Sequence, residues 1–321
     1  MPLLSENGIT SVCEGRTYWR REFQDAWMKA ENENELSVKA VLCLWGYPHL
    51  DDTEQIEELK SMYQNDPDKL VRMSQIKLYS DGIIPNTTAA MHEEYDLDLG
   101  FLPENKGLNY FSEDRMTQYI TELEKVGFDF HIHGIGDRGI HESLNAIETA
   151  RQTNGDVGAR HRLTHLEVVD PADYPRFKEL DVIVDCQVAG EFTQPENWPE
   201  NEQYIGNRAN NLVPLKDLHD AEAFMTLSSD WDVSDMNPFV GMQNALTRVP
   251  QNLPDLETVI KAYTINAAYV MRQEDLVGSL EVGKLADLII LDQNIFEVPI
   301  TQISQTKVLK TFLEGEVVFE R

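Results

Sequence analysis

Residues 128–137 read Phe-Asp-Phe-His-Ile-His-Gly-Ile-Gly-Asp. The alternation of this run predicts a short β-strand with His131 and His133 on one face and the apolar residues on the other. Two glycines then turn the chain into residues 138–151, whose apolar spacing is typical of a helix. A histidine at the end of a strand, facing a loop, lies where parallel α/β folds place their chemistry. The alternative is a histidine with a purely structural role.

The same strand-then-helix pattern recurs along the chain, which favours a parallel sheet built from β/α units. Seven strands are predicted, near residues 9–13, 37–45, 74–79, 128–133, 160–166, 181–187 and 224–229. Helices are predicted near residues 16–34, 51–62, after Ser112 and over 256–272, with Ser112 as a helix N-cap. A closed (β/α)₈ barrel needs eight strands, so one is lacking.

The chain changes character after residue 277. Residues 280–291 read as a turn followed by a strand, and residues 308–321 read as a hairpin around Glu314-Gly315. We therefore expect two units, an incomplete barrel over 1–277 and a β appendage over 278–321. Two long stretches without a clear period, 83–111 and 189–211, are expected to be loops that border the functional site.

The composition excludes several classes of protein. A formal net charge of −29 over 321 residues disfavours nucleic acid and anionic membranes as partners. No apolar run reaches the length of a transmembrane helix. The three cysteines are widely spaced and form no CxxC motif, which argues against a disulfide framework and fits a reducing compartment, the cytoplasm.

Four polar residues lie at or just after the ends of different predicted strands: Lys77, His133, His165 and Asp230. Parallel strands bring these ends to one mouth of a barrel. Imidazole and carboxylate groups are the ligands that zinc and similar divalent metals take in proteins. The four positions therefore predict a metal centre at that mouth.

Five motifs carry a resemblance to a known family. The chain resembles the amidohydrolase superfamily, and within it amidohydrolase family 3, the branch of N-substituted formamide deformylase-like enzymes. The motifs occur in the family's order: Ile-Lys-Leu-Tyr-Ser-Asp-Gly at 76–82, His-Ile-His-Gly-Ile-Gly-Asp-Arg at 131–138, His-Arg-Leu-Thr-His at 161–165, Ser-Ser-Asp-Trp at 228–231 and Gly-Ser-Leu-Glu-Val-Gly-Lys-Leu-Ala-Asp at 278–287.

The resemblance implies a TIM-like barrel with two metal ions and a small β-sandwich-type appendage. By its pattern Lys77 is carboxylated and bridges both metals, and His133 and His165 hold the second metal. Asp230 binds the first metal and acts as the catalytic proton shuttle. The implied reaction is metal-dependent hydrolysis of a C–N bond in a small non-peptide amide or formamide.

Four further residues are candidates for supporting these ligands. Period-2 alternation puts His131 on the face of His133 but deeper, and the four-residue spacing of His161 and His165 puts them on one side. Asp81 and Asp137 belong to the motifs that contain Lys77 and His133. For the two histidines, a supporting role and no role are equally compatible with the sequence.

One family feature is missing from this sequence. The family's first strand carries a His-x-His pair for the first metal, and here that spacing occurs only at His131 and His133. We therefore expect a barrel that lacks its first strand and an impaired first metal site, holding one or two ions, most naturally zinc. Three explanations stay open: a shortened gene product, a second chain that covers the gap, or a tolerated gap.

The sequence consequently leaves alternatives for function. The first is an amidohydrolase that acts on a small amide, and the sequence is compatible with a homo-oligomer. The second is a catalytically inactive or partner-dependent fragment of such an enzyme. A third is a hydrolase with one metal held by His133, His165 and Lys77.

Overall fold

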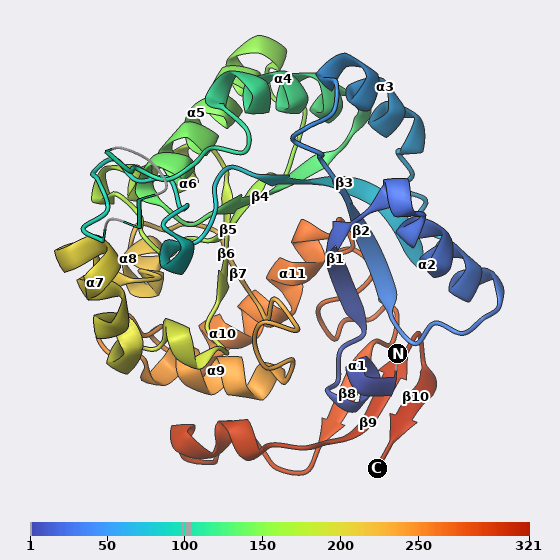
Figure 1. The fold of residues 1–321 in the computed structure, drawn as a ribbon. Helices are drawn as coiled ribbons and strands as arrows, with labels where there is room; N and C mark the ends of the chain where they lie inside the picture. The colour runs from blue at the N-terminus through green and yellow to red at the C-terminus, as the bar shows by residue number, and fades with distance from the viewer. Residues whose placement is uncertain (1, 98, 101–103) are drawn as a thin grey trace.

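The protein is described here by a computed structural model, which covers residues 2–97, 99–100 and 104–321. Its centre is one curled sheet of seven parallel strands, each paired with its neighbours in the sequence (Figure 1). The outer strands β1 and β7 are not paired with each other within these residues. The strands are β1 (Ser11–Thr17), β2 (Lys39–Trp45), β3 (Val71–Tyr79), β4 (Asp129–Gly134), β5 (Arg162–His165), β6 (Ile183–Gln187) and β7 (Met225–Ser228).

All seven predicted strands are present, and the predicted barrel without one strand is confirmed. The register aligns the strand ends, because Tyr79 of β3 lies opposite His133 of β4 and Gly134 of β4 lies opposite His165 of β5. The carboxyl ends of β3, β4 and β5 therefore lie at one edge of the sheet, as the placement of the site requires.

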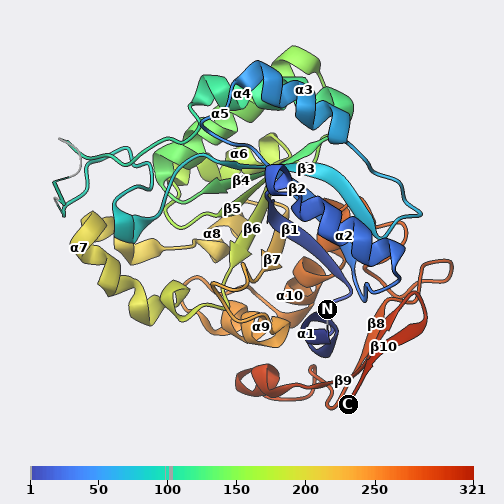
Figure 2. The same cartoon turned by 45° about the vertical axis from the view of Figure 1, so that its right-hand side comes forward.

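Helices cover the outer, convex side of the curled sheet, as both views show (Figures 1 and 2). Ser112 caps α4 as predicted, since its hydroxyl accepts a hydrogen bond from the Arg115 N–H at 3.4 Å. The helices on this side and around it are α2 (Phe23–Asn32), α3 (Asp52–Met62), α4 (Glu113–Leu123), α5 (Asp137–Asn154), α6 (Tyr174–Glu179), α8 (Leu215–Asp220) and α9 (Pro238–Thr247).

Two stretches differ from their predicted structure. The helix predicted over 256–272 is divided at Thr264, whose backbone (φ −123°, ψ −94°) leaves the helical region, into α10 (Leu256–Tyr263) and α11 (Ile265–Val270). The predicted loop 189–211 is mostly helical: 3₁₀ turns occupy Glu191–Thr193, Pro195–Asn201 and Gly206–Asn211, and α7 spans Glu202–Ile205. Asn, Pro and Gly suit such short turns. The turns are too short to show the apolar periodicity by which a longer helix is predicted from sequence. Residues 98 and 101–103 of the other predicted loop lie outside the described part of the chain.

The apolar core lies between the sheet and its outer helices. Phe130 and Ile132 of β4 are fully buried there, together with Leu163 of β5 and Leu144 of α5. The alternation of residues 128–133 therefore separates the two faces as predicted. Burial of such side chains stabilises a fold by about 1.5–3 kcal/mol each, so the convex side of the sheet is the main source of stability.

The C-terminal appendage is a three-stranded antiparallel sheet in the order β10-β9-β8. Its strands are β8 (Leu288–Leu291), β9 (Val308–Leu313) and β10 (Glu316–Glu320), and the short helix α1 (Pro2–Glu6) packs against β9 and β10. An ion pair of 3.2 Å joins Arg321 to Glu6, so the two ends of the chain lie side by side (Figure 1). The predicted boundary at residue 277 stays a prediction.

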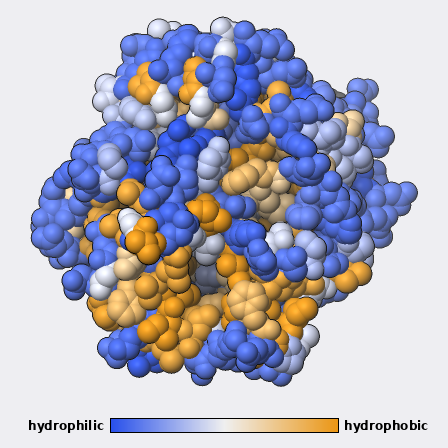
Figure 3. All heavy atoms as spheres, turned by 180° about the vertical axis from the view of Figure 1, so that it is seen from behind, coloured by the Kyte–Doolittle hydropathy of each residue, from blue (hydrophilic) through white to orange (hydrophobic). Residues whose placement is uncertain are grey.

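Seen from behind, the lower half of the molecule carries apolar side chains around a hollow (Figure 3). In the orientation of Figure 1 this is the height of α9, α10 and the C-terminal sheet. None of the described helices is both long enough and apolar enough to cross a membrane.

Candidate metal centre

A cavity of about 1650 Å³ fills the inner, concave side of the sheet. Its lining includes all four residues that the sequence singled out, namely Lys77, His133, His165 and Asp230. They come from the carboxyl ends of β3, β4 and β5 and from the loop after β7. The fold thus brings these four side chains into one cavity.

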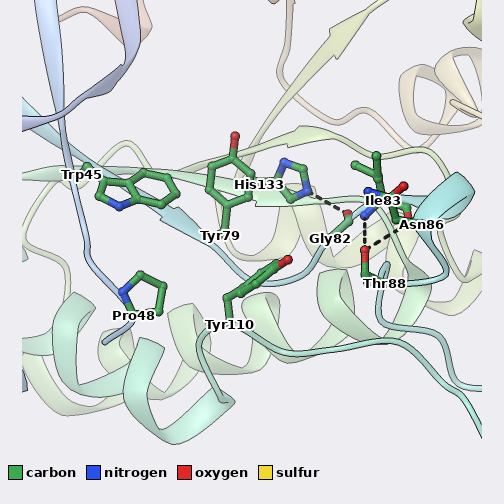
Figure 4. A pocket seen from close by; sticks show the side chains of 9 residues that line it. All are labelled: Trp45, Pro48, Tyr79, Gly82, Ile83, Asn86, Thr88, Tyr110 and His133. Atoms are coloured by element: carbon green, nitrogen blue, oxygen red, sulfur yellow. Dashed lines mark hydrogen bonds between the residues drawn. The ribbon is translucent and has the colours of Figure 1, made fainter. Parts of the chain in front are cut away.

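His133 is held in one orientation, and one of its two ring nitrogens has no hydrogen-bond partner among the described residues. Its Nε2 lies 3.0 Å from the carbonyl oxygen of Gly82, which fixes Nε2 as the donor, and the buried Nδ1 has no hydrogen-bond partner (Figure 4). The ring stacks on Tyr79 at 4.1 Å. Burial, assisted by the charge of Lys77, lowers the pKa of His133 to about 3. The imidazole is therefore neutral at physiological pH, with a free lone pair on Nδ1.

His165 lies beside it, with the two ring centroids 4.5 Å apart. Its backbone is left-handed, at φ 81°, so the strand's alternation ends at this residue. Burial lowers the pKa of His165 well below its usual value, and the nearby His133 and Lys77 add to this effect because each would repel a protonated His165 when itself protonated. Two neutral imidazoles consequently lie next to each other at the mouth of the cavity.

Lys77 is buried, with 3% of its surface exposed, and its Nζ lies 5.2 Å from the centroid of the Tyr79 ring. Burial lowers its pKa to about 7, which brings the amine close to neutrality. Within the described residues no ion pair joins Lys77 to Asp230, although the charge of Asp230 opposes the lowering of the Lys77 pKa. Burial raises the pKa of the Asp230 carboxyl, and the charge of Lys77 opposes this effect.

As predicted, His131 lies on the same face of β4 as His133. This residue lines the cavity one step below His133, and its Nδ1 lies 2.8 Å from Nη2 of Arg162. Its Nε2 is buried without a partner. Burial and the adjacent guanidinium hold the pKa of His131 well below its usual value.

The prediction that His161 faces the same side as His165 is wrong. His161 points to the helical side of the sheet, where its Nε2 lies 2.9 Å from a carboxylate oxygen of Glu124 and its Nδ1 accepts the Phe130 N–H at 3.1 Å. The inward residues of β5 are Arg162 and Thr164. The four-residue spacing was misleading because the left-handed backbone of His165 is not that of a β-strand, so the alternation of side chains does not extend to this residue.

Asp81 and Asp137 organise the loops around the site. Asp81 is fully buried and accepts the Gly136 N–H at 2.8 Å, and its Oδ1 lies 3.6 Å from Nε2 of His133. Burial raises the pKa of Asp81 to about 7 despite these hydrogen bonds. Asp137 accepts the N–H of His92 at 2.8 Å and so joins the loop after β3 to the start of α5. Asp81 thus lies beside His133 and holds the loop after β4, whereas Asp137 joins two loops.

The sequence analysis missed a polar network on β5, β6 and β7. Asp185 accepts hydrogen bonds from Thr164 at 3.2 Å, Thr226 at 3.0 Å and Ser228 at 3.2 Å. Gln187 donates to Thr164 and Ser228 at 2.9 and 2.7 Å. The alternation of residues 183–187 contained the signal, because it places Asp185 and Gln187 on the inner face.

A smaller pocket of about 340 Å³ adjoins His133 (Figure 4). The Tyr79 ring lies between His133 and Trp45, and the Trp45 and Tyr79 centroids are 4.8 Å apart. Tyr110 and Ile83 add apolar surface to its lining. The pocket is therefore suited to an apolar or flat group of a molecule whose reacting bond lies near His133.

A divalent metal ion needs several donor groups close together. In the part of the chain that the structure describes, no three His, Cys, Asp or Glu side chains gather closely enough to hold a metal ion by themselves. His133 nevertheless has the typical arrangement of a metal ligand, with one nitrogen donating to a carbonyl and the other unpartnered. With His165 beside it and a near-neutral Lys77 in the same cavity, the residues fit one divalent ion better than two.

Comparison with known proteins supports this assignment of the fold and its motifs. A solved structure, an uncharacterized metal-dependent hydrolase from Pyrococcus horikoshii, matches with a TM-score of 0.76 at 23% identity, over 93% of this chain and 59% of that one. Among curated proteins, Protein LONG AFTER FAR-RED 3 of Arabidopsis thaliana is 25% identical over 97% of this chain. The N-substituted formamide deformylase of Arthrobacter pascens is 26% identical over 67% of it.

The chain spans about half the length of these relatives, 55% of the Arabidopsis protein and 41% of the deformylase. The model of the amidohydrolase family matches residues 2–319, almost the whole sequence. The chain therefore belongs to the amidohydrolase family.

Proposed function

We propose that this chain provides the metal-binding half of an amidohydrolase site that cleaves a C–N bond in a small non-peptide amide or formamide. The observation that carries the proposal is the convergence of Lys77, His133, His165 and Asp230 in one cavity. The unpartnered Nδ1 of His133 and the lowered pKa of Lys77 give these residues the protonation states that ligands require.

His133 and His165 would hold a divalent ion, with Lys77 and Asp230 as the remaining protein ligands. When bound, such an ion polarises the amide carbonyl and makes the attacking water more acidic. Zinc fits the nitrogen and oxygen donors of this set.

The chain's own residues supply the other parts of the reaction. Asp230 can accept the proton of the attacking water and pass it to the leaving nitrogen, because it lines the cavity that also holds His133 and His165. Lys77 is near neutrality at physiological pH, and a neutral amine can add carbon dioxide to become an oxygen ligand. The aromatic pocket beside His133 binds the substituent of the amide.

A second candidate is a protein that binds metal but hydrolyses slowly or needs a partner. It is favoured by the open side of the sheet between β1 and β7 and by the absence of a three-residue His, Cys, Asp or Glu cluster in the described residues. A catalytic zinc site usually has three protein ligands. We therefore expect the 321-residue chain alone to be a weak catalyst.

The two candidates are separated by measuring binding and turnover on the same samples. Zinc affinity is measured by competition with a chromogenic chelator, and hydrolysis with a panel of N-formyl and N-acyl amines in zinc-containing buffer. We expect His133→Asn to weaken zinc binding by about 10–100-fold or more while the protein remains folded.

Asp230→Asn provides the matched control for chemistry. If the chain hydrolyses any member of the panel, this variant should lose at least about 100-fold in turnover with a smaller effect on zinc affinity. Zinc binding that depends on His133 without turnover would favour the second candidate. Zinc affinity that His133→Asn leaves unchanged would contradict the assignment of the site.

A further inference from the structure

Beneath the candidate metal centre, the inner face of the sheet carries a second polar layer instead of the branched apolar residues usual in such barrels. Two thiols lie in it, Cys13 on β1 and Cys43 on β2. Their sulfurs lie 3.7 and 3.3 Å from the same side-chain oxygen of Gln75. The two sulfurs thus approach the same oxygen atom from neighbouring, paired strands.

A buried cation faces this pair. Arg162 is 4% exposed, and its Nη1 and Nη2 approach the sulfurs of Cys13 at 3.6 Å and Cys43 at 3.9 Å. The nearest carboxylate, Asp185, is 4.0 Å from Nε, which forms no hydrogen bond. The oxygens of Asp185 already accept from hydroxyls of β5 and β7.

The charge of Arg162, which already pairs with Asp185 at 4.0 Å, can also stabilise a second anion among the groups it contacts. A thiolate on Cys13 supplies one. Hydrogen bonds from Cys43 and the charge of Arg162 lower the pKa of Cys13 to about 6, in spite of its burial. Burial raises the pKa of Cys43 well above its usual value, so Cys43 keeps its proton. The pair is thus one thiolate and one thiol.

We propose that Cys13 and Cys43 form a peroxide-sensitive dithiol that closes to a disulfide between β1 and β2. Neither residue belongs to the set that would hold the metal, so the proposal is independent of the proposed function. The oxidant is hydrogen peroxide, a molecule small enough to enter the cavity that Cys13 lines.

The reaction proceeds in two balanced steps. The Cys13 thiolate attacks one oxygen of hydrogen peroxide, the O–O bond breaks, and the departing hydroxide takes a proton to become water. The sulfur of Cys43 then attacks the sulfenic acid on Cys13, the S–O bond breaks, and the second oxygen leaves as water with the proton of the Cys43 thiol. Two thiols and one peroxide thus give one disulfide and two waters.

Two features of the fold favour the closure. Among the strands of the described residues, β1 lies at the end of the sheet and pairs with β2 alone. Its register already shifts between Glu14 and Thr17, so it can move without breaking the centre of the sheet. Cys186 offers an internal control, because it is fully buried in the apolar core and burial raises its pKa to about 12.

The test is oxidation of the reduced, metal-free full chain with stoichiometric hydrogen peroxide, followed by alkylation and peptide mass spectrometry without reductant. We expect a peptide pair joined by a Cys13–Cys43 disulfide, with Cys186 recovered as the alkylated thiol. Before oxidation, Cys13 should alkylate at least about 100-fold faster than Cys186 at neutral pH, because the thiolate is the reacting form.

Two variants assign the roles. In Cys43→Ala the reaction should stop at a sulfenic acid on Cys13, which dimedone traps, and in Cys13→Ser the Cys43 thiol should survive the same treatment. Circular dichroism of both variants checks that they are folded. The proposal is overturned if Cys13 reacts no faster than Cys186. It is also overturned if the wild-type chain accumulates sulfenic or sulfinic acid on Cys13 without forming the disulfide.

Discussion

The two faces of the same strands differ more than any two separate parts of the molecule. On β4, Phe130 and Ile132 point outward into a dry apolar core under the helices, while His131 and His133 point inward to the cavity. On the outer face His161 and Glu124 pair with each other, and unpartnered buried atoms such as Thr121 Oγ1 and Arg151 Nε lie on the covering helices. The inner face leaves several polar atoms of the strands unpartnered, among them His131 Nε2 and His133 Nδ1.

The two faces therefore differ in role: the outer face stabilises the fold, and the inner face holds the groups that can bind a ligand or react. Outer residues are optimised for packing, so a change there should alter unfolding and leave binding properties of the folded fraction intact. Inner residues carry desolvated charges and orphaned nitrogens, which cost free energy in the resting protein. A change there should remove function and can even stabilise the fold. Variants on each face test this division.

The largest effect is expected from Phe130→Ala on the outer face. Deleting a fully buried ring should lower the free energy of unfolding by about 3–5 kcal/mol, measured by urea denaturation. Ile132→Val, on the same face of the same strand, is the matched control and should cost only about 0.5–1.5 kcal/mol. Equal effects of the two variants would show that this face is not the packed core described here.

The second effect has the opposite sign and concerns Lys77→Met on the inner face. The folded-state pKa of Lys77, about 7, lies below that of an unfolded lysine, so the unfolded chain binds the proton more tightly. Protonated Lys77 therefore destabilises the fold at and below pH 7, and the wild type should gain stability as the pH rises from about 7 to 10. We expect Lys77→Met to raise the free energy of unfolding by on the order of 2–4 kcal/mol at pH 6.

That gain should shrink at pH 10, because Lys77 is then neutral in the folded state and the pH is close to the pKa of an unfolded lysine. Thermal denaturation of the metal-free protein at both pH values measures it. A variant that is equally stabilised at pH 6 and pH 10 would indicate a packing effect and contradict a buried, titrating lysine.

The smallest effect is expected at Glu124 on the outer face. Burial raises the pKa of Glu124, but hydrogen bonds from His161 and Asn154 outweigh it and leave the pKa below its usual value. Its ionised form therefore stabilises the fold above the unfolded pKa, and this contribution is lost as the pH falls through the folded pKa. Glu124→Gln should cost about 1–2 kcal/mol at pH 7 and less near pH 3.

Glu122→Gln, which removes a carboxylate that pairs with two lysines on the exposed side of α4, is the control for Glu124. It should change the free energy of unfolding by less than about 1 kcal/mol. A larger loss at Glu122 than at Glu124 would mean that the buried pair with His161 contributes no more than surface charges do.

The sequence was sufficient for the fold and for the four residues at the mouth, because strand ends follow from period-2 alternation and the motifs mark them. It was not sufficient for His161. That prediction assumed that side chains alternate as far as His165, but the left-handed backbone of His165 interrupts the alternation. The network around Asp185 and the role of Arg162 depend on which strands become neighbours, and composition carries no such information. The pKa of Lys77 depends on burial, which only the folded chain defines.

The open order of the sheet has a consequence for local opening motions. β1 and β7 each have one strand neighbour, whereas β4, in the middle of the order, has three strands on either side. Openings can begin at either end and exchange backbone amides there with solvent without disturbing the centre. We therefore expect the strands that carry His133 and His165 to exchange most slowly, so that these two imidazoles stay aligned while the outer strands open.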